Sequence, residues 1–260
     1  MVFFFPIGTT LLALIKPATI CMEMSTNKDV RRDVITRRTA LTAAAGIGAA
    51  FGLAKAKAAE EQSGQSSSKV CVLTPEATEG PFYFDSKLVR SDITEGKQGA
   101  PLLLTLQIVE AKNCAAVPWA RVDVWHADGL GVYSGYADQE TGSTSGEKFL
   151  RGTQFTGTGG EVRFTTIYPG WYPGRTPHIH FKVFVEKHGV FTGQLYFPDP
   201  ITERVYATTL PYRERKEQRD TFNGDDFIFV RQGGSETVLN LKDEDNSYLA
   251  SLVIGIERNA

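Results

Sequence analysis

The chain has 260 residues and a formal net charge of −2 at pH 7, with 42% hydrophobic residues and 25 glycines. This near-neutral charge gives no electrostatic basis for binding nucleic acid or an anionic membrane, so neither is expected as a partner of the folded domain. The composition is that of an ordinary globular protein, and about 200 residues remain after an N-terminal segment, enough for one domain with a full core.

The first 59 residues have the features of an export signal. The pair Arg37-Arg38 precedes an apolar run rich in Ala and Gly, from Leu41 to Leu53, and small residues follow it at 54–59. A basic region, a short apolar run and a small-residue end are typical of a secretory signal. The paired arginines indicate the twin-arginine type. We therefore expect an exported protein, periplasmic or extracytoplasmic.

The beginning of the chain has two interpretations. Residues 3–5 are all Phe and belong to a second apolar patch ahead of the signal. Either the start is over-extended and Met22 or Met24 is the initiator, or the patch is a membrane anchor. Residues 60–69 are rich in Ser, Gln and Gly and predict a flexible linker. The folded domain is therefore expected at 70–260.

Two cysteines lie beyond the predicted leader, at Cys71 and Cys114. An oxidising compartment and two cysteines in the mature chain favour one disulfide between them. Two separate buried thiols are the alternative, because spacing alone does not give the geometry.

Short apolar or alternating runs between Gly- and Pro-rich turns predict strands. They lie at 102–109, 121–125, 148–155, 161–168, 178–185 and 193–197. A short helix is predicted over 201–208, and a closing hairpin is predicted from 227–232 and 236–241. Short strands at regular spacing indicate an all-β fold, an antiparallel β-sandwich with long loops and at most short helices.

The strand predicted at 178–185 carries two histidines on one face. Since strand side chains alternate between faces, Ile179 and Phe181 should point into the core, and His178 and His180 should both point away from it. Two imidazoles at positions i and i+2 can bind one metal ion. Two hydrogen-bonded or solvated strand histidines are the alternative.

Two tyrosines stand in turns that adjoin predicted strands. Tyr133 follows a Gly-rich break after 121–125, and Tyr172 follows the turn at Pro169-Gly170. A phenol has a pKa of about 10, and a bound metal can convert it into the hard anionic ligand that Fe(III) favours. No cysteine lies near this site, which argues against structural zinc. A ferrous site with one carboxylate would need an Asp or Glu beside the histidines of 178–180, and the pattern His-x-Asp occurs only at 126–128, away from them in the sequence.

Four segments resemble stretches of the intradiol ring-cleavage dioxygenases, the family of the catechol and protocatechuate enzymes that use non-haem Fe(III). Residues 125–134, which begin Trp-His-Ala-Asp, and residues 172–181, which begin Tyr-Pro, are similar to its two signatures. Residues 74–83 and 193–197 resemble further family segments.

The resemblance implies a ferric ion held by two phenols and two imidazoles, those of Tyr133, Tyr172, His178 and His180. It implies cleavage of a catechol-type ring by O₂ to a muconate-type dicarboxylic acid. Tyr172 is expected to leave the metal and take substrate protons. Arg175 would stabilise negative charge on the substrate, and Gln194 would position O₂ or a late intermediate.

Other readings stay open. The domain could be an exported binding module of the transthyretin kind, or it could hold zinc or copper on His178 and His180 alone. Tyr136, Tyr168 and His126 do not stand at ligand positions of the signatures, and they are expected to be structural. A homo-oligomer is possible, and the sequence does not single out one catechol.

Overall fold

The structure is a computed structural model that describes residues 71–139, 142–185, 189–245 and 247–257. The strands are β1 Pro101–Glu110, β2 Arg121–Trp125, β3 Arg151–Phe155, β4 Glu161–Ile167, β5 His178–Val185, β6 Gly189–Tyr196, β7 Asn240–Glu244 and β8 Ser247–Ile256. The helices are α1 Asp199–Thr208 and α2 Phe227–Arg231, with 3₁₀ turns at Tyr212–Glu214 and Gly234–Thr237.

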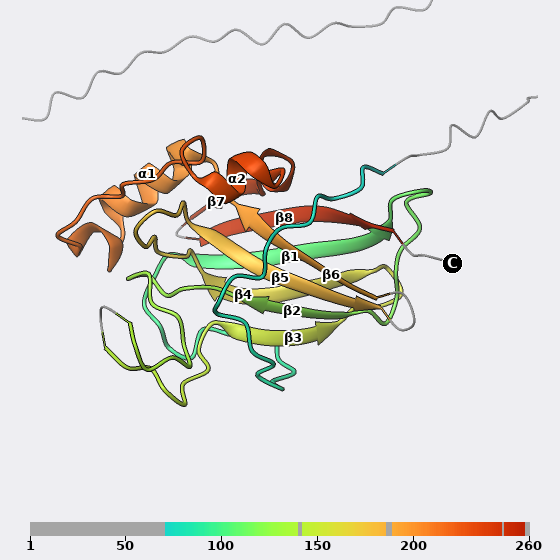
Figure 1. Cartoon of the computed structure of the whole chain (residues 1–260), viewed down its shortest axis with the longest axis horizontal. Coiled ribbons are helices and arrows are strands. Elements are labelled where there is room, and N and C mark those ends of the chain that lie inside the picture. Colours follow the sequence, from blue (N-terminus) through green and yellow to red (C-terminus); the bar gives the residue numbers. More distant parts are fainter. Residues whose placement is uncertain (1–70, 140–141, 186–188, 246, 258–260) are drawn as a thin grey trace, which may run out of the picture. The chain divides into compact units, whose positions relative to one another are not determined.

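The strands form two four-stranded sheets, one in the order β4-β1-β8-β7 and the other in the order β3-β2-β5-β6 (Figure 1). Neighbouring strands are antiparallel except β1 and β8, which run parallel. The predicted all-β sandwich is therefore confirmed, with this one parallel pair in it.

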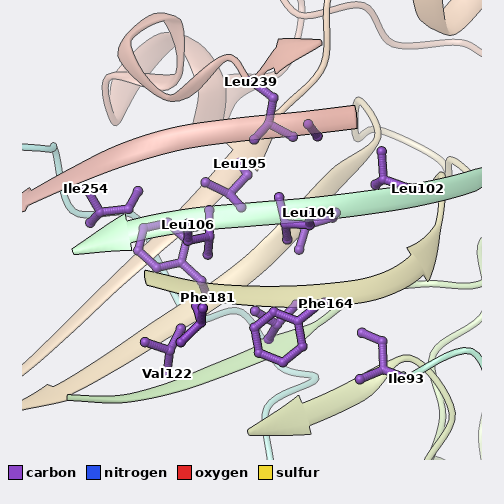
Figure 2. Close-up of a cluster of buried hydrophobic side chains, with 14 of the residues drawn as sticks. Ile93, Leu102, Leu104, Leu106, Val122, Phe164, Phe181, Leu195, Leu239 and Ile254 are labelled. Atoms are coloured by element: carbon purple, nitrogen blue, oxygen red, sulfur yellow. The ribbon is translucent and has the colours of Figure 1, made fainter. Parts of the chain in front are cut away.

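The core lies between the sheets and follows the period of two along the strands. On β1, Leu102, Leu104 and Leu106 are buried, whereas Leu103 between them is exposed. These leucines meet side chains from the opposite sheet, among them Phe181 of β5 (Figure 2). Burying each such side chain stabilises the fold by about 1.5–3 kcal/mol.

The six predicted strands are present. Those predicted at 121–125 and 178–185 have the predicted ends, and the other four have shifted ends; the predicted short helix begins at Asp199 rather than at 201. The hairpin predicted from 227–232 and 236–241 is wrong. The first of these runs is helix α2, because the side chain of Asp226 caps it by accepting hydrogen bonds from the backbone N–H groups of Ile228 and Phe229. The closing hairpin is instead formed by β7 and β8.

The predicted disulfide between Cys71 and Cys114 is present, with Cα atoms 5.2 Å apart. It ties the beginning of the described chain to the connection between β1 and β2. The export signal at 1–59 and the linker at 60–69 lie outside the described residues and stay predictions. In the ranges that the structure covers, no helix is long and apolar enough to span a membrane.

Replacing both Cys71 and Cys114 by Ser is expected to lower the free energy of unfolding. The disulfide joins positions 43 residues apart, and a loop of this length restricts the unfolded chain by about 4 kcal/mol. Denaturant titration of the double variant and of the oxidised parent measures the difference. An unchanged transition midpoint would show that the bond does not hold the fold.

Candidate metal centre

His178 and His180 lie where the period of β5 places them. Ile179 and Phe181 belong to the core cluster, and the two histidines project from the other face of the sheet. This face is not solvated at that point, because the exposed fractions of His178 and His180 are only 2% and 1%. The loops that cover the sheet therefore enclose both imidazoles.

Tyr133 lies in the loop between β2 and β3, and hydrogen bonds from side chains fix its backbone. Gln139 accepts a hydrogen bond from the N–H of Tyr133 and donates to its carbonyl oxygen, which also accepts from Thr144. Phe82 stacks on the phenol ring at 4.2 Å between centroids. The phenol is therefore held from the backbone and from one face of the ring.

Tyr172 comes from a second loop that packs closely on the first. Its carbonyl accepts a hydrogen bond from the N–H of Arg175 in a tight turn. Gly131, with φ of +86°, lies against the carbonyl group of Trp171, and a Cβ at this glycine would overlap that oxygen. Glycine thus permits the close approach of the two tyrosine loops.

The candidate metal-binding atoms of the two tyrosines and the two histidines, the phenol oxygens and the Nε2 atoms, lie close together. The Nε2 atom of His178 lies 3.1 Å from the hydroxyl oxygen of Tyr172 and 3.4 Å from that of Tyr133. It lies 3.1 Å from Nε2 of His180. Donors that bind one ion at about 2.0–2.2 Å are themselves separated by about 3 Å when the bonds are near right angles. The predicted residues therefore fit a single metal ion.

The orientation of each imidazole has its own cause. The carbonyl of Thr176 lies 2.7 Å from Nδ1 of His178, so that Nδ1 carries the proton and Nε2 presents its lone pair. The ring of His180 instead stacks on Trp125, with centroids 4.8 Å apart and planes 4° apart. Its Nδ1 is buried without a hydrogen-bond partner among the described residues.

Burial governs the protonation of the donors. It lowers the pKa of His178 and that of His180 well below the usual value, with the cation of Arg175 acting in the same direction. Burial raises the pKa of Tyr133 well above 10 and also raises the pKa of Tyr172, which Arg175 opposes. Neutral imidazoles suit a metal, but the phenols need a strongly charged cation to ionise them.

A model of the family described as Dioxygenase matches residues 77–204. Among solved structures, an intradiol ring-cleavage dioxygenase from Tetranychus urticae is 31% identical, with a TM-score of 0.67 over 73% of this chain and 96% of its own. The chain belongs to the intradiol ring-cleavage dioxygenases. The dioxygenase domain of a carbohydrate-binding fusion protein from Streptomyces sp. SirexAA-E is 26% identical, with a TM-score of 0.54 over 72% of this chain and 99% of its own.

Among the curated relatives of this intradiol dioxygenase is chlorocatechol 1,2-dioxygenase of Cupriavidus pinatubonensis. The two are 30% identical over 145 residues, 46% of this chain and 53% of the relative. Catechol 1,2-dioxygenase of Acinetobacter baylyi is 29% identical over 161 residues, 52% of this chain and 50% of the relative. The chain thus spans about half the length of the curated relatives that it matches.

Arg175 and Gln194 lie beside the tyrosine loops of this intradiol dioxygenase. The Nη1 atom of Arg175 is 3.5 Å from the hydroxyl oxygen of Tyr172, and its Nη2 donates to Oε1 of Gln194 at 2.6 Å. Gln194 also accepts from the hydroxyl of Tyr196 and donates to the carbonyl of Thr78. Both polar ends of Gln194 are therefore occupied by protein groups.

A cavity of about 540 Å³ opens over the two phenols. Aromatic and apolar side chains form much of its wall, and the ionisable groups of Asp138, Arg215 and Glu217 lie in its lining. Its volume falls in the range of pockets that hold small organic ligands, about 300–1,000 Å³. The cavity therefore offers a substrate direct access to Tyr133 and Tyr172.

The other candidate ligands are in structural positions. The hydroxyl of Tyr168 lies 2.7 Å from that of Thr202, and the hydroxyl of Tyr136 donates to a backbone carbonyl. His126 is fully buried between the carbonyl of Ala127 and the hydroxyl of Thr166. In the part of the chain that the structure describes, no three or more His, Cys, Asp or Glu residues cluster as a metal site. Among the described residues, a zinc site on His178 and His180 would therefore have no third His, Cys, Asp or Glu ligand.

Protein without bound metal is expected to lose stability in mild acid through His126. Burial lowers the pKa of His126 to about 4, whereas a histidine in the unfolded chain takes up a proton near pH 6.5. The unfolded state is therefore favoured progressively as the pH falls from about 6.5 to about 4, by about 3 kcal/mol from this residue. Denaturant titrations across this range measure the slope.

The variant His126→Asn keeps a donor and an acceptor but does not titrate, so it should take up about one proton fewer on unfolding near pH 5. The same slope in both proteins would show that His126 does not cause this acid sensitivity.

Proposed function

We propose that this chain is a non-haem Fe(III) enzyme that uses O₂ to cleave a catechol-type ring between its two hydroxyl-bearing carbons, giving a muconate-type dicarboxylic acid. Tyr133 and Tyr172 would hold the ion together with His178 and His180. The observation that carries the proposal is the meeting of two phenol oxygens and two imidazole nitrogens under one cavity. Such a set leaves room for a bidentate diol.

The iron would supply Lewis-acid activation of the bound diol toward O₂. The chain's own residues then have separate tasks. The phenol oxygen of Tyr172 faces Arg175, and the Tyr172 residue lines the cavity, so this phenol would be placed to accept a proton from the substrate. Arg175 keeps a fixed positive charge beside that oxygen. Tyr133 is the more deeply buried phenol and would stay in place.

The substrate would enter over Phe82, Tyr133 and Tyr172, which line the cavity. A planar diol fits among these rings, since aromatic pairs prefer offset-stacked or edge-on contacts. The low pKa of the two histidines, which follows from their burial, keeps their lone pairs available to iron at neutral pH. The enclosed position of both imidazoles also limits their contact with water.

In iron-supplied protein, replacing Tyr133 by Phe or His178 by Ala is expected to lower the iron content and, with it, the phenolate-to-iron absorption band, because one of the four ligands is lost. Ring cleavage should fall by at least about 100-fold, because each change removes a direct donor. Metal analysis, visible spectra and oxygen uptake with a panel of catechols measure these effects. The matched control is Tyr168→Phe, which removes a phenol that is as fully buried but lies outside the site.

This control should keep the band and the turnover. Full activity in Tyr133→Phe would contradict the ligand assignment. A colourless wild-type protein that takes up no oxygen with any catechol would instead favour a binding module.

We further propose that the protein is exported by a twin-arginine signal and acts outside the cytoplasm. The disulfide between Cys71 and Cys114 supports this proposal, because such bonds persist in oxidising compartments. Replacing Arg37 and Arg38 by Lys should retain the full-length chain in the cytoplasm, as measured by fractionation. Unchanged export of this variant would exclude the twin-arginine route.

A further inference from the structure

The geometry points to Asp226 as a positioning residue for the candidate site, and we propose that its carboxylate aims the guanidinium of Arg175 at the phenol of Tyr172. This inference rests on the proposed function, and it concerns a residue outside the sequence motifs of the site. Asp226 lies at the beginning of helix α2, 51 positions after Arg175 in the chain.

The carboxylate of Asp226 is fully buried and receives hydrogen bonds from two sides. Its Oδ1 accepts from the backbone N–H groups of Ile228, at 2.8 Å, and Phe229, at 3.1 Å, which caps helix α2. Its Oδ2 accepts from Nε of Arg175 at 2.8 Å and from the N–H of Thr176 at 3.0 Å. One side chain thus joins α2 to the loop that carries Tyr172.

This arrangement requires two acceptor oxygens that face opposite ways. An asparagine has one carbonyl oxygen, and its amide nitrogen would turn a donor toward one of the two pairs of N–H groups. A serine is too short to reach both sides, although its hydroxyl can still cap the helix. The charge of Asp226 is also matched by the charge of Arg175, as a buried carboxylate requires.

Because the guanidinium is rigid, the hydrogen bond to Asp226 helps to fix the orientation of the whole group. Nε of Arg175 is fixed by Asp226, and Nη2 is fixed by Gln194, whose own polar ends are both occupied. Because the guanidinium is planar, two fixed nitrogens determine the position of the third. That third nitrogen, Nη1, is the one that lies 3.5 Å from the hydroxyl of Tyr172. Without Asp226, the cation would be free to turn away.

The test uses Asp226→Ser, which retains a helix cap and removes the anchor of Arg175. In iron-loaded full-length protein we expect kcat to fall about 10- to 100-fold, as for other small misplacements of a charged group, with KM little changed. Iron content should be unchanged, and the phenolate-to-iron absorption band should shift, because the cation beside Tyr172 has moved. Asp226→Asn, which can serve one side only, should lie between Asp226→Ser and the wild type.

The matched control is Val230→Gly, which loosens α2 at an exposed side chain and does not touch the carboxylate. This control should have the wild-type band and kcat. If Val230→Gly reproduces the spectral shift, the effect of Asp226 comes from the helix alone and the proposal fails.

A double-mutant cycle with Arg175→Lys decides the route by which Asp226 acts. Lysine cannot reproduce the fixed fork, so Asp226→Ser should lower kcat much less in the Arg175→Lys background than in the wild type. An equal loss in both backgrounds would overturn the proposal, since it would mean that Asp226 acts through the backbone of Thr176 instead. A wild-type protein without the band and without turnover would refute the proposed function itself and is recognised separately.

Discussion

The candidate site depends on the burial of four uncharged polar side chains against one another on the face of a sheet that points away from the core. Nε2 of His178 faces the oxygens of both tyrosines and the nitrogen of His180 at 3.1–3.4 Å. Buried polar atoms with poorly matched partners cost about 1–3 kcal/mol each. A cation bound among them would relieve that cost by taking up their lone pairs, so this arrangement would suit the metal ion that we propose.

The loops keep the donors there through contacts that cross the sequence. Arg151 of β3 is buried and donates to the carbonyl of Phe82 and to the hydroxyl and carbonyl oxygens of Ser134. Arg151 therefore fixes Phe82, whose ring stacks on Tyr133, and Ser134, which follows Tyr133 in the chain. Arg175 acts on the other tyrosine loop. Each of the two phenols thus lies in a segment secured by an arginine, whose several fixed donors suit such bridging.

The alternation of side chains along a single strand was enough to predict the two histidines of the site. The alternation along β5 placed His178 and His180 on a common face, and the motif resemblance pointed to Tyr133 and Tyr172. The burial of that face was not predictable, because it is produced by loops with no period of their own. The same limit explains Gln194. It lies in the strand predicted at 193–197, but its place opposite His180 and its contacts with Arg175 and Thr78 could not be predicted.

The error in the region of α2 has the same physical origin. Residues 227–230 are an apolar run that suits a strand as well as a helix, and Gly233-Gly234 favoured a hairpin. The local evidence for a helix was Asp226, a good N-cap residue. The importance of this residue could not be judged from the sequence, because it depends on the hydrogen bonds that Arg175 and Thr176 donate to its carboxylate. A residue that caps a helix and also anchors a cation at the site is constrained twice, by stability and by geometry. Its identity is therefore set more narrowly than helix capping alone requires, because a serine would meet only the capping constraint and an asparagine could serve only one of the two sides.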